Sequence, residues 1–134
     1  MALVKPGAGS EFLAPLTERI YSTFAPIQKA RVLALMQGQV PPLADQIGKV
    51  IEVRDVLAHW IETVDEDTGE IKAFWRVVLA NGEQAYQAAS KGVRQSIGTI
   101  SRFYGEPPWD PPLKLKVEQI TTAKRRKYFV LSPV

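Results

Sequence analysis

The sequence contains no cysteine and a single histidine, His59, among its 134 residues. Disulfide bonds and thiolate metal sites are therefore excluded, which agrees with a reducing compartment. A lone histidine beside Trp60 in a predicted strand is more typical of a hydrogen-bonded structural residue than of a catalytic or metal-binding one. No apolar run approaches the ~20 residues of a membrane span, and no basic-then-apolar secretion signal is present. We therefore expect a cytoplasmic protein that does not bind membranes.

The sequence also lacks the patterns that catalysis commonly needs. No Gly-rich phosphate loop, Ser/His/Asp constellation or paired buried carboxylates can be identified, and Ser90 is better placed to cap a helix than to act as a nucleophile. The acidic residues Asp65, Glu66 and Asp67 have the chemistry to bind Mg²⁺, although a solvated turn is the more usual structure for such a cluster. We therefore predict no enzymatic activity, no cofactor and no metal, and keep a small metal-dependent hydrolase as a minor alternative.

Charge is unevenly distributed along a chain whose length suits one domain. The formal net charge is +3, yet residues 48–89 carry four Lys and Arg against eight Asp and Glu. Residues 113–134 carry six Lys and Arg against one Glu, a net charge of about +5. This basic end predicts an anionic partner, and phosphates fit best because aromatic residues that stack on bases lie beside the cations.

The first region, residues 1–47, is predicted to be a flexible N-terminus and a helical arm. The arm covers residues 11–38, with weak helical character from Leu13 to Tyr21. Pro26 is well placed as the first residue of a second helical stretch, which Gly38 ends. We expect the arm to pack either on the rest of the chain or on a neighbouring subunit, and the sequence favours neither.

The second region, residues 48–134, begins with a predicted three-stranded meander. Residues 50–63 are rich in β-branched and aromatic side chains and predict one bent strand, followed by an acidic turn. Residues 71–79 alternate clearly and predict a second strand. The pair Asn81-Gly82 is a strong hairpin signal that returns the chain as a third strand. One face of the second strand carries Ile71, Ala73, Trp75, Val77 and Leu79, and the other carries Lys72, Phe74, Arg76 and Val78.

A helix and a hairpin complete the expected order. Ser90 is a helix N-cap, and apolar residues recur at helical spacing until Gly105. Gly92 weakens this helix by up to ~1 kcal/mol, so the helix must pack on the sheet. Leu113 to Leu131 predict two strands whose tip carries four consecutive cations. The apolar helix positions are Val93, Ile97, Ile100 and Tyr104, and the outward positions of the first hairpin strand are Lys114, Lys116 and Glu118.

This element order predicts a mainly β fold. Five antiparallel strands with one helix between the third and the fourth are the order of the OB-fold, a small Greek-key barrel whose face and loops commonly hold single-stranded nucleic acid or sugars. We therefore expect an OB-like five-stranded barrel over residues 48–134, preceded by the helical arm. Other small barrels and sheet-plus-helix domains share the same order of elements.

Several segments of the second region together resemble a known family. They are Asp65-Glu66-Asp67-Thr68-Gly69-Glu70, Tyr86 with Ser90-Lys91-Gly92-Val93, Gly105-Glu106-Pro107-Pro108-Trp109 and the basic terminal hairpin. From about Gly48 to Val134 the chain is similar to the small replication-associated single-stranded DNA-binding proteins of phages and mobile elements. The resemblance implies an OB-like fold, non-specific strand binding, a role in replication or recombination and, for a viral protein, the host cytoplasm. The acidic C-terminal tip by which bacterial-type single-strand-binding proteins recruit partners is absent from this sequence.

The candidate nucleic-acid contacts are cations and flat side chains, for which phosphates and bases are the natural ligands. Each has a structural alternative: a buried barrel wall for Phe74, a loop-holding pin for Trp109, a solvated tip for the four cations and a polar helix face for the helix cations. The stems of the two strand lysines can also simply cover apolar surface. The candidates are Lys72, Phe74, Arg76, Lys91, Arg94, Arg102, Trp109, Lys114, Lys116, Lys124, Arg125, Arg126, Lys127 and Tyr128.

Our leading hypothesis is a non-catalytic protein that coats single-stranded DNA in replication or recombination, with the cations and rings lining a common groove. RNA binding by the same surface is a close variant, because no residue reports on a 2′-hydroxyl. The alternative is an interaction or assembly protein that docks an acidic protein partner through its basic C-terminal hairpin. An arm before a small barrel also predicts a homo-oligomer, a dimer or a higher assembly.

Overall fold

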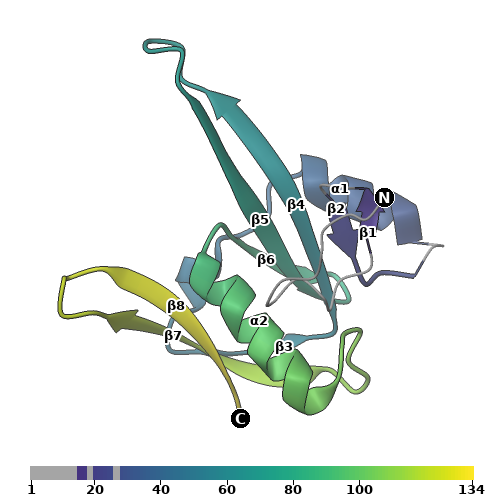
Figure 1. Ribbon diagram of the computed structural model, residues 1–134. Helices are drawn as coiled ribbons and strands as arrows, with labels where there is room; N and C mark the ends of the chain where they lie inside the picture. The colour runs from purple at the N-terminus through teal and green to yellow at the C-terminus, as the bar shows by residue number, and fades with distance from the viewer. Residues whose placement is uncertain (1–14, 18–19, 26–27) are drawn as a thin grey trace.

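The computed structural model describes residues 15–17, 20–25 and 28–134, and within them the fold is mainly β (Figure 1). Two antiparallel sheets have the strand orders β1-β2-β4-β5-β6 and β3-β7-β8. None of the helices described is long and apolar enough to cross a membrane. The strands are β1 (Pro15–Thr17), β2 (Ile20–Ser22), β3 (Val50–Val53), β4 (Asp55–Val64), β5 (Ile71–Asn81), β6 (Gln84–Ala88), β7 (Leu113–Thr121) and β8 (Lys127–Pro133), and the helices are α1 (Lys29–Gln37), the 3₁₀ helix η2 (Leu43–Gln46) and α2 (Lys91–Tyr104).

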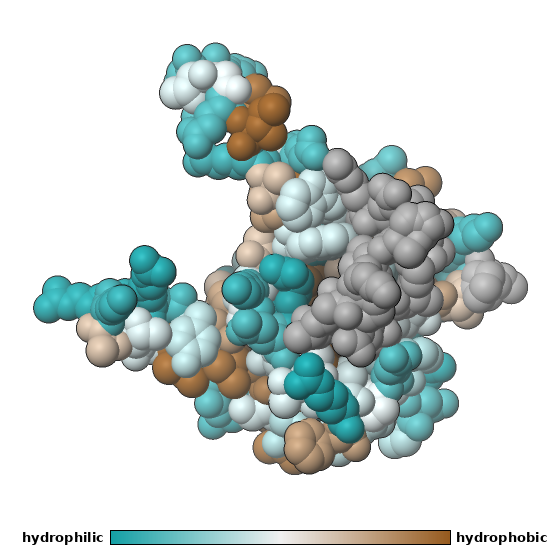
Figure 2. Space-filling view, in the orientation of Figure 1, coloured by the Kyte–Doolittle hydropathy of each residue, from teal (hydrophilic) through white to brown (hydrophobic). Residues whose placement is uncertain are grey.

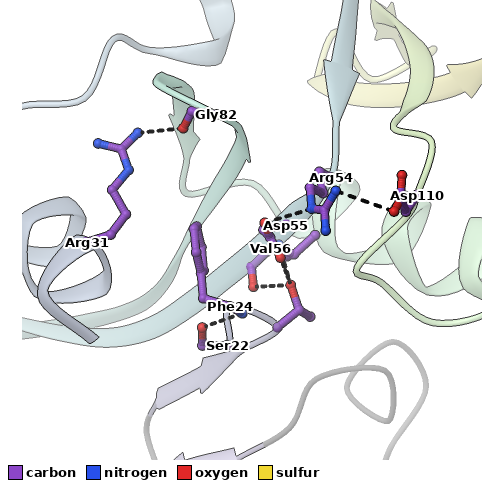
Figure 3. A network of polar contacts seen from close by, with 9 residues as sticks. Ser22, Phe24, Arg31, Arg54, Asp55, Val56, Gly82 and Asp110 are labelled. Carbon is purple, nitrogen blue, oxygen red and sulfur yellow. Dashed lines mark hydrogen bonds and ion pairs between the residues drawn. The ribbon is translucent and has the colours of Figure 1, made fainter. Parts of the chain in front are cut away.

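The strand expected over residues 50–63 breaks at Arg54 into β3 and β4, which belong to different sheets. The Arg54 amide donates to the Ala80 carbonyl at 2.9 Å, and the Arg54 carbonyl accepts from the Trp109 amide at 2.9 Å. The Arg54 guanidinium lies 3.8 Å from the Asp55 carboxylate and 3.7 Å from that of Asp110 (Figure 3). This junction is therefore fixed to β5 and to the proline-rich loop, and it joins the two sheets.

The predicted five-stranded barrel does not close, because β6 and β8 end their sheets without pairing to each other. Helix α2 follows β6 and lies against β8 instead, where the Leu131 amide donates to Ser96 Oγ at 3.1 Å. A Cβ at Gly92 would come within 2.3 Å of the Phe129 carbonyl oxygen. Gly92 weakens the helix locally, as expected, but it is also what permits α2 to approach β8 this closely.

The main core lies between the two sheets and α2, and the alternation of β7 is confirmed. In β5 the predicted apolar face is confirmed for Val77 and Leu79, which lie in this core, whereas Ile71 of the same face is exposed. Leu115 and Val117 are fully buried, whereas the intervening Lys114 and Lys116 are exposed. Ser90 caps α2 as predicted, its side chain accepting from the amides of residues 92 and 93. Tyr104 is a correction, because 56% of it is exposed whereas the other apolar helix positions are buried. The core includes Val56, Ala58, Val77, Leu79, Val93, Ile97, Ile100, Leu115, Val117 and Leu131.

The N-terminal region is partly strand rather than helix. The expectation of helical character from Leu13 to Tyr21 is wrong for the described residues 15–17 and 20–21, which form β1 and part of β2. Strand β2 pairs with β4, and its end is held by Thr23 Oγ1, which accepts from the Val56 amide at 2.9 Å. The β4 strand therefore supplies an edge that overrides local helical propensity.

Helix α1 confirms the second helical stretch, which ends where the Gly38 amide donates to the Ala34 carbonyl. Its expected first residue, Pro26, lies outside the described residues. Val32 and Leu35 of α1 pack with Leu57 and Val78 on the outer face of the larger sheet. The helix thus covers this chain's own sheet.

Candidate nucleic-acid interface

Two hairpin arms project from the body with an open space between them (Figures 1 and 2). The acidic arm is the outer part of β4 and β5, residues 61–74, and the basic arm is the outer part of β7 and β8, residues 118–130. The acidic arm extends from the larger sheet and the basic arm extends from the smaller one, and Arg54 lies at the junction of the two sheets. The basic arm is the predicted C-terminal hairpin, and the acidic arm is the predicted hairpin around residues 65–70.

The tip of the acidic arm is a solvated turn. Asp65 Oδ1 accepts from the Asp67 amide at 2.8 Å, and the Gly69 amide donates to the Asp65 carbonyl at 2.8 Å. Gly69 has φ of 71°, which favours glycine. The Asp65 carboxylate therefore stabilises the turn. Because it is negatively charged, it would repel a phosphate rather than bind one.

The tip of the basic arm presents four exposed cations, Lys124 to Lys127. The Arg125 amide donates to the Thr122 carbonyl at 2.8 Å, and the Arg126 amide donates to Thr122 Oγ1 at 3.1 Å. Arg125 has φ of 62°, a left-handed conformation that is unfavourable for a long side chain. Within residues 15–17, 20–25 and 28–134, none of the four cations forms an ion pair. Their charges are therefore available to an external anion.

A hollow of about 560 Å³, which we call the inter-sheet groove, is lined by residues of β5 and β6 of the larger sheet and by Phe129 of β8. Phe74 and Arg76 reach it from the face of β5 that also carries Val78, the outer face that α1 covers. Half-buried Phe74 of β5 and half-buried Phe129 of β8 both line it, so rings from the two sheets share one surface. The prediction that Phe74 faces away from the apolar set of β5 is consistent with this position. Phe129 was not among the predicted contacts, although it directly follows the candidate Tyr128. The remaining lining residues are Pro42, Ala44, Ile61, Arg76, Gln87, Ala88, Ala89 and Ser90.

The wall of this groove is held by Arg76, which is only 7% exposed. Arg76 Nη1 donates to the Leu35 carbonyl at 2.9 Å and to His59 Nε2 at 3.0 Å, and Arg76 Nε donates to Gln87 Oε1. Burial, and secondly the charge of Arg76, lower the pKa of His59 from its ordinary value of 6.5. His59 is therefore a neutral acceptor at neutral pH, and the guanidinium of Arg76 is used for internal bonds.

A second hollow of about 420 Å³, which we call the helix groove, lies between α2 and β8. Tyr128, 40% exposed, lines this groove rather than the one that holds Phe74. Phe129 lines both, so the two hollows adjoin at this residue. Phe103 and Tyr104 of α2 line the helix groove as well, and sequence reasoning missed both, since the first had no pattern and the second fitted the helix core.

The remaining candidates divide into exposed cations and internal residues. Trp109 is 4% exposed, and its Nε1 donates to the Gly105 carbonyl at 2.9 Å. It therefore has the structural role considered in the sequence analysis, in which it holds the proline-rich loop against the body. Arg94 is half-buried, and burial lowers the pKa of its guanidinium. The exposed cations among these remaining candidates are Lys72 on the acidic arm, Lys91 and Arg102 on α2, and Lys114 and Lys116 on β7.

Aromatic-lined hollows beside unpaired cations are the features with which proteins hold unpaired nucleic acid through its bases and phosphates rather than through its sequence. A comparison with protein families agrees: residues 19–133 match the model of the phage single-stranded DNA-binding protein family of the Phi29 type. The chain belongs to this family, and the resemblance seen in the sequence is confirmed. No curated protein and no solved structure matches the chain.

Proposed function

We propose that the protein is a non-catalytic, sequence-independent single-stranded DNA-binding protein that acts in replication or recombination of a phage genome in the host cytoplasm. The observation that carries the proposal is the inter-sheet groove, which is lined by Phe74 at the base of the acidic arm and by Phe129 at the base of the basic arm, whose tip carries four exposed cations. Family membership supports the choice of single-stranded DNA as the ligand.

The arrangement supports an OB-like binding mode. In OB-folds the face of the second and third strands and the two loops that flank it hold oligonucleotides. If β3 and β4 are taken as one bent first strand, β5 and β6 are the second and third, and α2 precedes the fourth. The flanking loops are then the tips of the acidic and the basic arm. Strands β6 and β8 do not pair with each other, which corresponds to a barrel that is partly open.

Each group of residues has a distinct role in this proposal. Bases stack on Phe74 and Phe129, at about 1–3 kcal/mol for each stacked base. Arg76 and Trp109 are left out as contacts, because both are buried and bonded internally. The phosphate contacts are Lys72, Lys91, Arg94, Arg102, Lys114, Lys116, Lys124, Arg125, Arg126 and Lys127.

The direct test is fluorescence anisotropy with labelled oligo-dT at two salt concentrations. Each phosphate contact in a single strand should contribute a slope of about −0.7 to the dependence of log affinity on log salt. We expect binding that weakens with salt and exceeds binding to a duplex of the same length. Affinity that is independent of salt, or equal for duplex and single strand, would contradict the proposal. An oligo-rU of matched length decides between DNA and RNA.

Assembly is the second candidate function, and one observation favours it. The chain carries both an acidic tip, residues 65–70, and a basic tip, residues 124–127, on separate arms. The basic tip would therefore find an acidic partner in another copy of the same chain, in the head-to-tail contact that generates rings or filaments. Such contacts would give the homo-oligomer predicted from the sequence.

A further inference from the structure

The helix groove is a built feature rather than a loose gap. Gly92 lets the start of α2 approach the backbone of Phe129, and Ser96 Oγ accepts from the Leu131 amide at 3.1 Å. These two contacts fix the distance between α2 and β8 along the groove. The hollow therefore exists before any ligand binds.

The lining of the groove contains more exposed aromatic surface than the core requires. Phe103 is 84% exposed, Tyr104 is 56% exposed and Tyr128 is 40% exposed, yet all three line this single hollow. A phenylalanine exposed to this degree contributes little to folding, since burial of apolar surface is what stabilises a core. Its position at a hollow with two tyrosines instead fits a flat ligand that stacks on rings.

Cations flank the same hollow on the side of β7. Ser132 lines the groove and pairs directly with Lys116, so their side chains leave the same face of the hairpin as neighbours. Lys114 lies two residues further along that face. Both lysines are exposed, and neither forms an ion pair within the part of the chain that the structure describes. Rings next to unpaired cations match the bases and phosphates of a nucleic acid better than an apolar peptide.

We propose that the helix groove is a second binding site for single-stranded DNA, which continues the path of the strand from the inter-sheet groove across Phe129. Bases stack on Phe103 with Tyr128 and Tyr104 beside them, and phosphates contact Lys114 and Lys116. This inference rests on the proposed function. It adds Phe103 and Tyr104 as DNA contacts. The proposed contact surface then extends from the inter-sheet groove past β8 to α2.

The test compares a short and a long oligo-dT, of about 5 and about 15 nucleotides, within the range of site sizes known for OB-folds. Phe103→Ala should weaken binding of the long oligonucleotide by about 5- to 100-fold and leave the short one unchanged, because the short one fills the inter-sheet groove alone. Phe103→Trp should keep the affinity, and its added indole fluorescence should be quenched by the long oligonucleotide. Ile71→Ala, another exposed apolar position, near the tip of the acidic arm, is the matched control and should change neither affinity.

The outcomes distinguish failure of the proposed function from failure of the second binding site alone. If the wild-type protein binds neither oligonucleotide, the proposed function fails and the second site fails with it. If the wild type binds and Phe103→Ala binds the long oligonucleotide equally well, the second site alone is refuted. A Phe103→Ala variant that loses affinity equally for the short and the long oligonucleotide also refutes the second site. In that case Phe103 would affect binding of an oligonucleotide too short to reach the helix groove. Circular dichroism of each variant confirms that the fold is retained.

Discussion

Arg76 donates through Nη1 to Nε2 of His59 at 3.0 Å, and this bond places the only histidine of the chain under a permanent positive charge. The same guanidinium bonds to α1 and β6, through Leu35 and Gln87. The inner wall of the inter-sheet groove, the helix that covers the sheet and the neutral state of His59 are therefore coupled.

Acidification should destabilise the protein through His59. Its pKa is lowered in the folded state, so the unfolded chain binds more protons as pH falls below about 6.5. The stability present above that pH is then lost as pH falls through the folded-state value. Thermal unfolding at about pH 7.5, 6.5 and 5.5 measures the effect. His59→Gln keeps an acceptor but cannot titrate, so its unfolding temperature should vary less over this range, and an unchanged slope would contradict the assignment.

Arg125→Gly should reduce DNA affinity without reducing stability by more than about 1 kcal/mol. Glycine relieves the left-handed conformation at this position, which offsets its greater entropy in the unfolded chain. The loss of one phosphate contact should make the salt dependence shallower by about 0.7. Arg126→Gly is the matched control, because it removes the same charge where φ is not positive. Urea denaturation gives the free energy of unfolding of both variants. If Arg125→Gly and Arg126→Gly lower it equally, glycine does not relieve strain at position 125.

Phe74→Ala should weaken binding of the short oligo-dT by about 5- to 100-fold, the contribution of one or two stacked bases. Phe74→Tyr retains a flat ring and should bind nearly as well as the wild type, whereas Phe74→Leu retains apolar bulk and should not. Anisotropy titrations at one fixed salt concentration make the comparison. Equal binding by the leucine and tyrosine variants would show that apolar contact, not stacking, is the interaction.

Gly92→Ala should destabilise the fold by about 1–3 kcal/mol, because the added Cβ overlaps the Phe129 carbonyl and forces α2 from β8. The helix propensity of alanine acts in the opposite direction and by less, up to about 1 kcal/mol. Urea denaturation gives the free energy of unfolding. Lys91→Ala, at the exposed neighbouring position, should be within about 0.5 kcal/mol of the wild type. A stabilised Gly92→Ala variant would mean that the close approach is not required.

Charge reversal tests the assembly through the two tips. One variant changes Lys124, Arg125, Arg126 and Lys127 to Glu, and the other changes Asp65, Glu66 and Asp67 to Lys. Sedimentation without DNA should show the wild type self-associating at low salt and each variant alone as a monomer, because like charges then meet. The mixture should associate again, since each variant retains the tips that its partner lacks. A mixture that remains monomeric excludes this contact.

Local patterns predicted the elements whose cause is local. The Ser90 cap, the turn near Gly82 and the alternation of β7 each depend on neighbouring residues, and all three are present. The break at Arg54 depends on Ala80 and Trp109, which are distant in sequence, so no local signal marked it. Strand β2 likewise exists because β4 offers a pairing edge.

The candidate surface was predictable as composition but not as geometry. The cations on the outward face of β7 and at the basic tip follow from alternation and from the run of charges, and they are exposed. Arg76 is buried because α1 packs over this part of the sheet and its Leu35 carbonyl accepts from the guanidinium. The sequence around Arg76 contains no signal for this contact with a distant helix. The rings were expected to line a common groove, but Phe74 and Tyr128 line separate hollows, because Tyr128 and its neighbour Phe129 point to opposite faces of β8.

Trp109 has a mechanical consequence that extends beyond its own loop. Its amide holds the Arg54 carbonyl where the sheets meet, and its indole holds the Gly105 carbonyl at the end of α2. One buried residue thus connects the junction of the two sheets to the end of α2. A substitution of Trp109 would therefore alter how the two arms are held relative to α2, although Trp109 lines neither of the two grooves.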